Sequence, residues 1–187
     1  MNNSVVSLAA YVPLLALVAT AAVTDLRARR IPNWLTLTVT LAGLAQSLTP
    51  WGVTTFSHSL FGLLAGFVAT FVLYILGGRG AGDVKLTAGI GAWLGPKAVL
   101  LVLIAAAVVS LVMVVGQCLA KGKLLVLLSN TRLMLTNVMN VQRLGTRHVI
   151  ESGQAVRSVD RPLPNAVSML IATVAVVGWM AVAAGRS

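Results

Sequence analysis

Acidic residues are the scarcest charged groups in this sequence of 187 residues. Only four are present, Asp25, Asp83, Glu151 and Asp160, against 14 lysines and arginines. All charged residues together make up 10% of the chain, whereas a soluble domain usually carries about 25%. Because 58% of the residues are hydrophobic, there is too little charge to cover a water-facing surface. An ordinary soluble domain is therefore excluded.

Cysteine is nearly absent as well. Cys118 stands alone inside an apolar run, so an internal disulfide and a four-cysteine zinc site are both excluded. We interpret it as a packing residue.

Long apolar runs dominate what is present. Runs of about 18 to 25 residues match the length that crosses a hydrocarbon core of about 30 Å. The mean hydropathy is +0.93. We predict an all-α polytopic membrane bundle of about six transmembrane helices, with residues 1–187 forming one integral membrane domain. The apolar stretches lie at about 4–24, 34–49, 58–76, 86–95, 98–120 and 164–184, and the fourth is short.

The basic residues fall on one side of this predicted bundle. Segments 27–30, 77–85 and 121–163 hold 12 of the 14 lysines and arginines, and only Lys97 and Arg186 lie elsewhere. Positive residues stay cytoplasmic, so we expect these segments inside, both termini outside, and an inner-membrane location among lipids. The first span continues into a basic loop, so we do not expect a cleaved signal peptide. Topology explains the net charge of +10, and we expect no nucleic-acid binding.

Residues 121–163 are too apolar for a plain linker. Leucines, methionines and valines alternate there with Asn, Thr and Arg in a rough helical pattern. We predict an amphipathic helix on the cytoplasmic interface, followed by a polar loop from about 145 to 162. It could hold anionic lipid, cover a neighbouring site or dock a partner.

Two of the four acids are placed at the same edge of the bundle. Asp25 closes the first span and Asp83 opens the fourth, so both lie at the predicted cytoplasmic end. A carboxylate beside the hydrocarbon is costly unless it pairs, faces water or does chemistry. The structural alternatives are a partner for the nearby arginines in the case of Asp25 and a helix N-cap in the case of Asp83.

The sequences around the two acids differ in character. Asp25 precedes the arginine cluster and then Ile31-Pro32-Asn33, where the proline breaks one helix and the asparagine can start the next. Asp83 follows four glycines in the six residues 77–82. Such a segment lets an extended peptide backbone approach the acid, although a tight turn is the simpler explanation of the glycines.

These residues resemble the type IV prepilin peptidases, a family of membrane aspartic proteases. The resemblance rests on Gly80-x-Gly82-Asp83-x-Lys85 together with an upstream Asp25, Arg27 and Ile31-Pro32-Asn33, and it covers about residues 10–110. It implies cleavage of the short basic leader of a prepilin, after a glycine and on the cytoplasmic side. It also implies that Asp25 and Asp83 are the catalytic pair, with no metal or other cofactor.

The same resemblance suggests residues that contact the substrate. Family substrates carry an acidic residue early in the mature segment, which Lys85 or Arg79 could attract, although topology alone also explains basic residues there. Pro164 resembles a proline motif that opens the last span in the family, with Asn165 in place of the usual aromatic residue. The candidate substrate-binding residues are Gly80, Gly82, Lys85, Arg79, Arg27 and Pro164.

Larger family members add a segment with two pairs of cysteines and a methyltransferase activity. This sequence begins directly at its first span and has one cysteine. We therefore expect cleavage without methylation, as in the small members that serve tight-adherence (Flp) pili. Two other functions stay open, a non-catalytic scaffold or assembly subunit and a small transporter with a proton relay.

The chemistry expected of the pair requires one shared proton. The ionised carboxylate would activate water while the neutral one polarises the amide carbonyl. Asp83 opens a helix, which favours its anion, and Asp25 closes one, so our hypothesis puts the resting proton on Asp25. His58 and His148 lie on opposite predicted sides and cannot form one metal site. The pairs Gly62/Gly66 and Gly91/Gly95 predict close helix packing.

Overall fold

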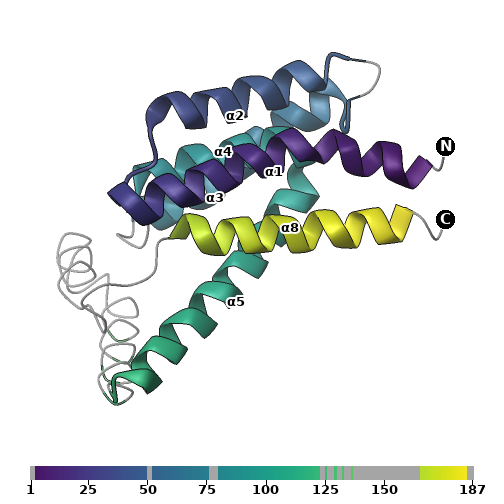
Figure 1. Ribbon diagram of the computed structural model, residues 1–187. Coiled ribbons are helices and arrows are strands. Elements are labelled where there is room, and N and C mark those ends of the chain that lie inside the picture. The colour runs from purple at the N-terminus through teal and green to yellow at the C-terminus, as the bar shows by residue number, and fades with distance from the viewer. Residues whose placement is uncertain are drawn as a thin grey trace.

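The computed structural model describes residues 3–49, 52–75, 80–122 and 165–184, together with Leu125, Ser129, Arg132 and Thr136. Regular secondary structure in these ranges is entirely α-helical. It comprises α1 (Asn3–Ala28), α2 (Asn33–Gln46), α3 (Phe56–Ile75), α4 (Ala81–Leu94), α5 (Pro96–Ala120) and α8 (Asn165–Ala184), as Figure 1 shows. Each predicted apolar stretch corresponds to one of these helices, so the all-α membrane bundle is confirmed.

Three predictions fall largely or wholly outside the described residues. Arg79 and Pro164 are among the residues not described, as is most of the segment 121–163. Within that segment the four isolated residues named above are helical and exposed.

Four helices are long and apolar enough to cross a membrane. The candidate spans are Ala10–Ala28, Phe56–Ile75, Pro96–Ala120 and Asn165–Ala183. The other two helices, α2 and α4, have 14 residues each and fall short of the roughly 20 that a crossing needs. Full crossing by those two helices stays a prediction, while the polytopic helical architecture stands.

The short helix α4 is the centre of the bundle. It contacts α3 and α2 extensively and α5 less so. Every residue from Asp83 to Leu94 is buried except Lys85. A helix enclosed by other helices in this way meets little lipid, which is why its length is not set by the thickness of the hydrocarbon core.

Glycines allow α3 and α4 to touch backbone to backbone, as their spacing predicts. A Cβ atom added to Gly62 would collide with the Gly91 carbonyl oxygen, and one added to Gly91 would collide with that of Gly62. One turn further, a Cβ on Gly66 would lie 2.6 Å from the Thr87 oxygen. Close backbone approach through small residues is a standard way for membrane helices to gain packing energy.

Polar side chains form hydrogen bonds between the helices. Ser59 Oγ donates to the Ala92 carbonyl at 2.6 Å, and Trp93 Nε1 donates to the Val39 carbonyl at 3.0 Å. Ser110 Oγ of α5 donates to Ser168 Oγ of α8 at 2.8 Å. These bonds satisfy groups that would otherwise be costly in an apolar interior. Cys118 is fully buried without a disulfide, in agreement with a packing role.

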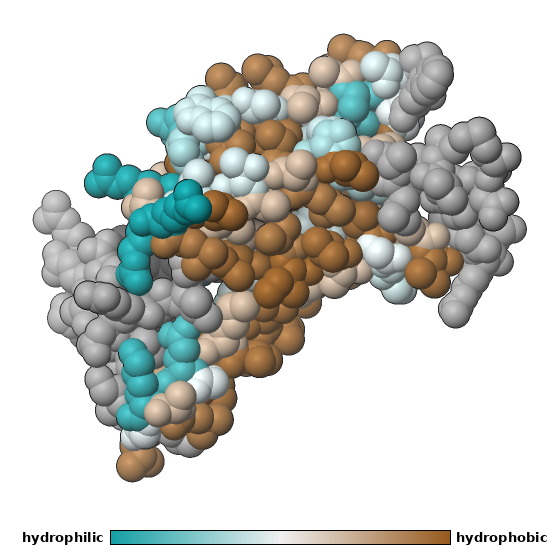
Figure 2. All heavy atoms as spheres, viewed as in Figure 1, coloured by the Kyte–Doolittle hydropathy of each residue, from teal (hydrophilic) through white to brown (hydrophobic). Residues whose placement is uncertain are grey.

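The outer surface is apolar where lipid would lie. Large exposed hydrophobic side chains run along α3 and α5. Figure 2 shows a largely apolar face, with hydrophilic groups at the end of the bundle where α1 finishes. Without water outside, such exposure costs nothing. The surface therefore matches a membrane protein.

The direction of the helices brings distant segments together. α1 and α8 pack antiparallel, so the last turn of α1 lies beside the first turn of α8, and α5 crosses at a steep angle (Figure 1). The start of α1 and the end of α8 lie together at the opposite end of the bundle. The end where α1 finishes is where the two acids predicted to be catalytic are found.

Candidate active site

Asp25 lies in the last turn of α1, at the point where the helix stops. Arg29 takes a left-handed backbone conformation with φ 50°, and its N–H closes the turn on the Asp25 carbonyl oxygen at 2.9 Å. Pro32 is the N-cap of α2, which begins at Asn33. The sequence after the acid thus ends one helix and begins another within a few residues. The Asp25 side chain is left partly buried at the bundle end.

Asp83 is held inside the first turn of α4. It is the third residue of the helix, not its N-cap, and its Oδ2 accepts the N–H of Gly80 at 3.3 Å. A carboxylate in this position satisfies a free N–H and lies at the positive end of the helix dipole. Only 6% of the residue is exposed.

The two acids are joined through the first two residues of α8. Asn165 Nδ2 donates to Asp83 Oδ2 at 3.0 Å, and the N–H of Ala166 donates to Asp25 Oδ2 at 3.2 Å. The two carboxyl groups are close enough to interact electrostatically. Residues 25, 83 and 165–166 are thus brought into one polar cluster.

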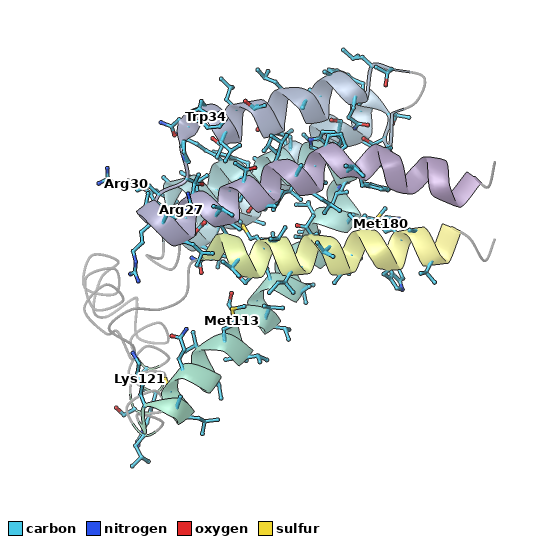
Figure 3. The ribbon with its side chains drawn as sticks, viewed as in Figure 1. Arg27, Arg30, Trp34, Met113, Lys121 and Met180 are labelled. Carbon is cyan, nitrogen blue, oxygen red and sulfur yellow. The ribbon has the colours of Figure 1, made fainter. Side chains whose placement is uncertain are left out.

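The arginines after α1 differ in their relation to this cluster. The charge of Arg29 acts on Asp25. Arg27 is exposed in the last turn of α1, and Arg30 points away from the bundle (Figure 3). The sequence singled out Arg27, whereas in the structure it is the charge of Arg29 that acts on Asp25.

Lys85 connects the two halves of the sequence motif. Its side chain is exposed, and Nζ donates to Asn33 Oδ1 at 2.9 Å. The bond ties the first residue of α2 to α4. Lys85 therefore has a structural contact that the sequence did not predict.

The two motif glycines have different surroundings. A Cβ on Gly82 would lie 3.2 Å from the Cβ of Ile31, so the absence of a side chain there makes room for the segment between α1 and α2. A Cβ on Gly80 would meet only Asp83 Oδ2, at 3.8 Å. Gly80 is exposed and leaves space next to the acid.

Asn165 and Ala166 are the contacts that sequence reasoning missed. The sequence marks this site only by a polar residue after Pro164 at the start of an apolar run. Helix N-terminal N–H groups are ready partners for carboxylates, but nothing in the sequence tells which acid will meet them. Chain direction and helix packing decide that.

Known proteins resemble the chain over the same region. The type IV leader peptidase family matches residues 12–115, which is more than half of the chain. The chain belongs to this family. The match includes Asp25 and Asp83 and ends before α8, so Asn165 and Ala166 lie outside the matched residues.

Three curated relatives of this type IV leader peptidase family member carry the name prepilin leader peptidase/N-methyltransferase. Two are from strains of Burkholderia pseudomallei, each 36% identical over 118 residues, which is 57% of this chain and 37% of the relative. One from Aeromonas hydrophila is 34% identical over 105 residues, 52% of this chain and 36% of the relative. The chain thus matches little more than a third of their length. No solved structure gives a significant match.

Proposed function

We propose that this family member is an aspartic endopeptidase that removes the leader of a prepilin, with Asp25 and Asp83 as the catalytic pair. The observation that carries the proposal is that the two acids meet at the start of α8, where each accepts one hydrogen bond from a residue of α8. Two of the four acids in the chain come together although 57 residues lie between them in the sequence. The names of the curated relatives support the prepilin as substrate.

The proposed reaction adds one water across the scissile amide. Ionised Asp83 takes a proton from the water, whose oxygen attacks the carbonyl carbon, while protonated Asp25 gives its proton to the carbonyl oxygen. The tetrahedral diol then collapses: one hydroxyl proton passes to Asp25, the C–N bond breaks, and the leaving nitrogen takes the proton that Asp83 holds. The pair ends with one proton, as it began.

The proposed site faces the cytoplasm at the inner membrane. The distribution of basic residues supports this orientation, because it would place the end of α1 and the start of α4 on the positive side. A prepilin has a basic leader followed by an apolar helix, so its cleavage point would stand at the membrane edge. The two acids occupy the same level at the end of the bundle.

Three further features belong to the proposal. Gly80 leaves room for an extended substrate backbone beside Asp83. Lys85, Arg27, Arg79 and Pro164 would contribute to substrate binding around that opening. We also propose that the chain cleaves without methylating and serves Flp-type pili.

A scaffold subunit is the second candidate function. In it, Asp83 and Asp25 would only cap helix ends, and the capping-type contact of Asp83 with Gly80 favours it. A cap does not require the two carboxylates to approach each other, and their approach favours the peptidase.

The test is cleavage of a co-expressed Flp-type prepilin in cells that lack their own prepilin peptidases. The peptidase account expects a shortened pilin whose new amino terminus follows the leader glycine and carries no added methyl group by mass spectrometry. An uncut prepilin beside a folded membrane-inserted chain would support the scaffold. A methylated terminus would contradict only the peptidase-only part.

A further inference from the structure

We propose that Asn165 is a positioning residue that keeps Asp83 as the anion of the pair and leaves the shared proton on Asp25. The inference deepens the proposed function and rests on it. Asn165 does not touch the reacting atoms in this account. It acts through Asp83.

The donors around the two acids are unequal. Asp83 Oδ2 accepts two hydrogen bonds, from Asn165 Nδ2 at 3.0 Å and from the Gly80 N–H at 3.3 Å. Asp25 Oδ2 accepts one, from the Ala166 N–H at 3.2 Å. Because a donor binds an ionised carboxylate more strongly than a neutral one, the additional donor favours the negative charge on Asp83.

The ends of the helices that carry the two acids favour the same distribution, whereas the positive start of α8 acts on Asp25 through the Ala166 N–H. Asp83 lies at the positive end of α4, whereas Asp25 lies in the last turn of α1, where the dipole of its own helix disfavours an anion. Among the hydrogen-bond donors to the two carboxylates in the described residues, Asn165 supplies the one side chain. The Gly80 and Ala166 donors are backbone and are present whatever the side chain.

Few charges surround Asp83 in the described residues. Asp25 interacts with it from the last turn of α1, and Lys85 lies on α4 itself, bonded to Asn33. α2 and α8 carry no charged side chain. The titratable residues of α3 are His58, which bonds Thr55 near the other end of the bundle, and the exposed Tyr74. The contribution of an uncharged amide is therefore measurable.

The position of Asn165 also leaves one oxygen of Asp83 available. Both donors meet Oδ2, so Oδ1 accepts no hydrogen bond from any described residue. This is the oxygen that we assign to the attacking water. An amide that holds Oδ2 fixes the plane of the carboxylate and therefore the direction in which Oδ1 points.

The scarcity of aspartate in this chain makes the inference directly testable. Labelling aspartate side-chain carboxyls with ¹³C gives three signals, from Asp25, Asp83 and Asp160, which the three Asp→Asn variants assign. The titration of the signals in detergent micelles then reports the protonation of the pair without any substrate. Coupled groups titrate in two shared steps, so both signals are followed over the whole range.

The variants compared are Asn165→Ala, Asn165→Leu, which keeps the size of the side chain, and Ser168→Ala. The last variant removes a buried hydroxyl from the same turn of α8. This hydroxyl accepts a hydrogen bond from Ser110 and donates one to the Asn165 backbone carbonyl, and neither bond involves a carboxylate. We expect the lower of the two shared titration steps to move to higher pH in both Asn165 variants, because the charged form of the pair then loses a hydrogen-bond donor. Ser168→Ala should leave it in place.

Cleavage of a synthetic prepilin peptide provides the second readout. The acid limb of the pH–kcat profile should move upward by the same amount in the Asn165 variants, with KM changed little. An unmoved Asp83 signal in a folded Asn165→Leu protein, or an equal shift in Ser168→Ala, overturns the inference. If the wild type cuts no prepilin while the titration shift occurs, the proposed function fails and the control of Asp83 by Asn165 stands.

Discussion

Lys85 Nζ donates a hydrogen bond to Asn33 Oδ1 at 2.9 Å, across 52 residues of sequence. The bond joins the start of α2 to the first turns of α4, and with them the two halves of the motif that the sequence suggested. Ile31 and Gly82 meet at the same junction. The motif residues therefore build a structural connection beside the two acids as well as a candidate binding surface.

A Lys85→Gln variant separates these two roles. If Lys85 attracts an acidic residue of the substrate, cleavage of an acidic prepilin peptide should fall by roughly tenfold and cleavage of its neutralised counterpart should change little. Peptide cleavage assays measure both rates. The matched control is Asn33→Ala, which removes the partner of Lys85 and keeps its charge, and it should retain the preference for the acidic peptide. Equal losses on both peptides would leave Lys85 without a substrate role.

Substitutions at the two motif glycines should have different effects. Gly82→Ala pushes a Cβ against Ile31 at 3.2 Å, and we expect it to lower the free energy of unfolding by about 1 kcal/mol. Gly80→Ala makes only an ordinary contact at 3.8 Å and should fold normally. If a substrate backbone approaches Gly80, its cleavage rate should still fall. Thermal unfolding and cleavage assays measure the two effects, and normal cleavage by Gly80→Ala would contradict the substrate contact.

The backbone contact between α3 and α4 predicts a stability difference between glycines. Gly62→Ala places a Cβ on the Gly91 carbonyl and should cost about 2 kcal/mol or more, because neither backbone can move without shifting a packed helix. Gly178→Ala on α8 meets nothing within 4 Å and should be neutral or slightly stabilising. Thermal unfolding in one mild detergent compares them. Similar melting temperatures for the two variants would show that the contact is not tight.

Much of the fold could be predicted because the membrane restricts it. Apolar stretches of the right length predicted the six helices, and the glycine pairs predicted close helix packing but not which helices would meet. The burial of α4 could not be predicted, because a short apolar stretch such as 86–95 has the same composition whether it faces lipid or protein. Its burial depends on where α2, α3 and α5 lie.

The candidate site was predictable for the acids and not for their partners. Asp25 and Asp83 stood out because a charge at the edge of a membrane needs a reason. The hydrogen bonds of Asn165 and Ala166 could not be foreseen, because they depend on α8 returning antiparallel to α1. The bond between Lys85 and Asn33 was not predicted either, because each residue had a local explanation in the sequence.

The most direct test of the central claim compares wild type with Asp25→Asn, Asp83→Asn and the double variant on one prepilin. Asparagine keeps the shape of aspartate and removes its ionisable proton. If the two acids act as one unit, each single variant should be folded and at least roughly a thousandfold slower, and the double variant should lose little more, because groups that act together are not additive. Cleavage near the wild-type rate by either single variant would contradict the account.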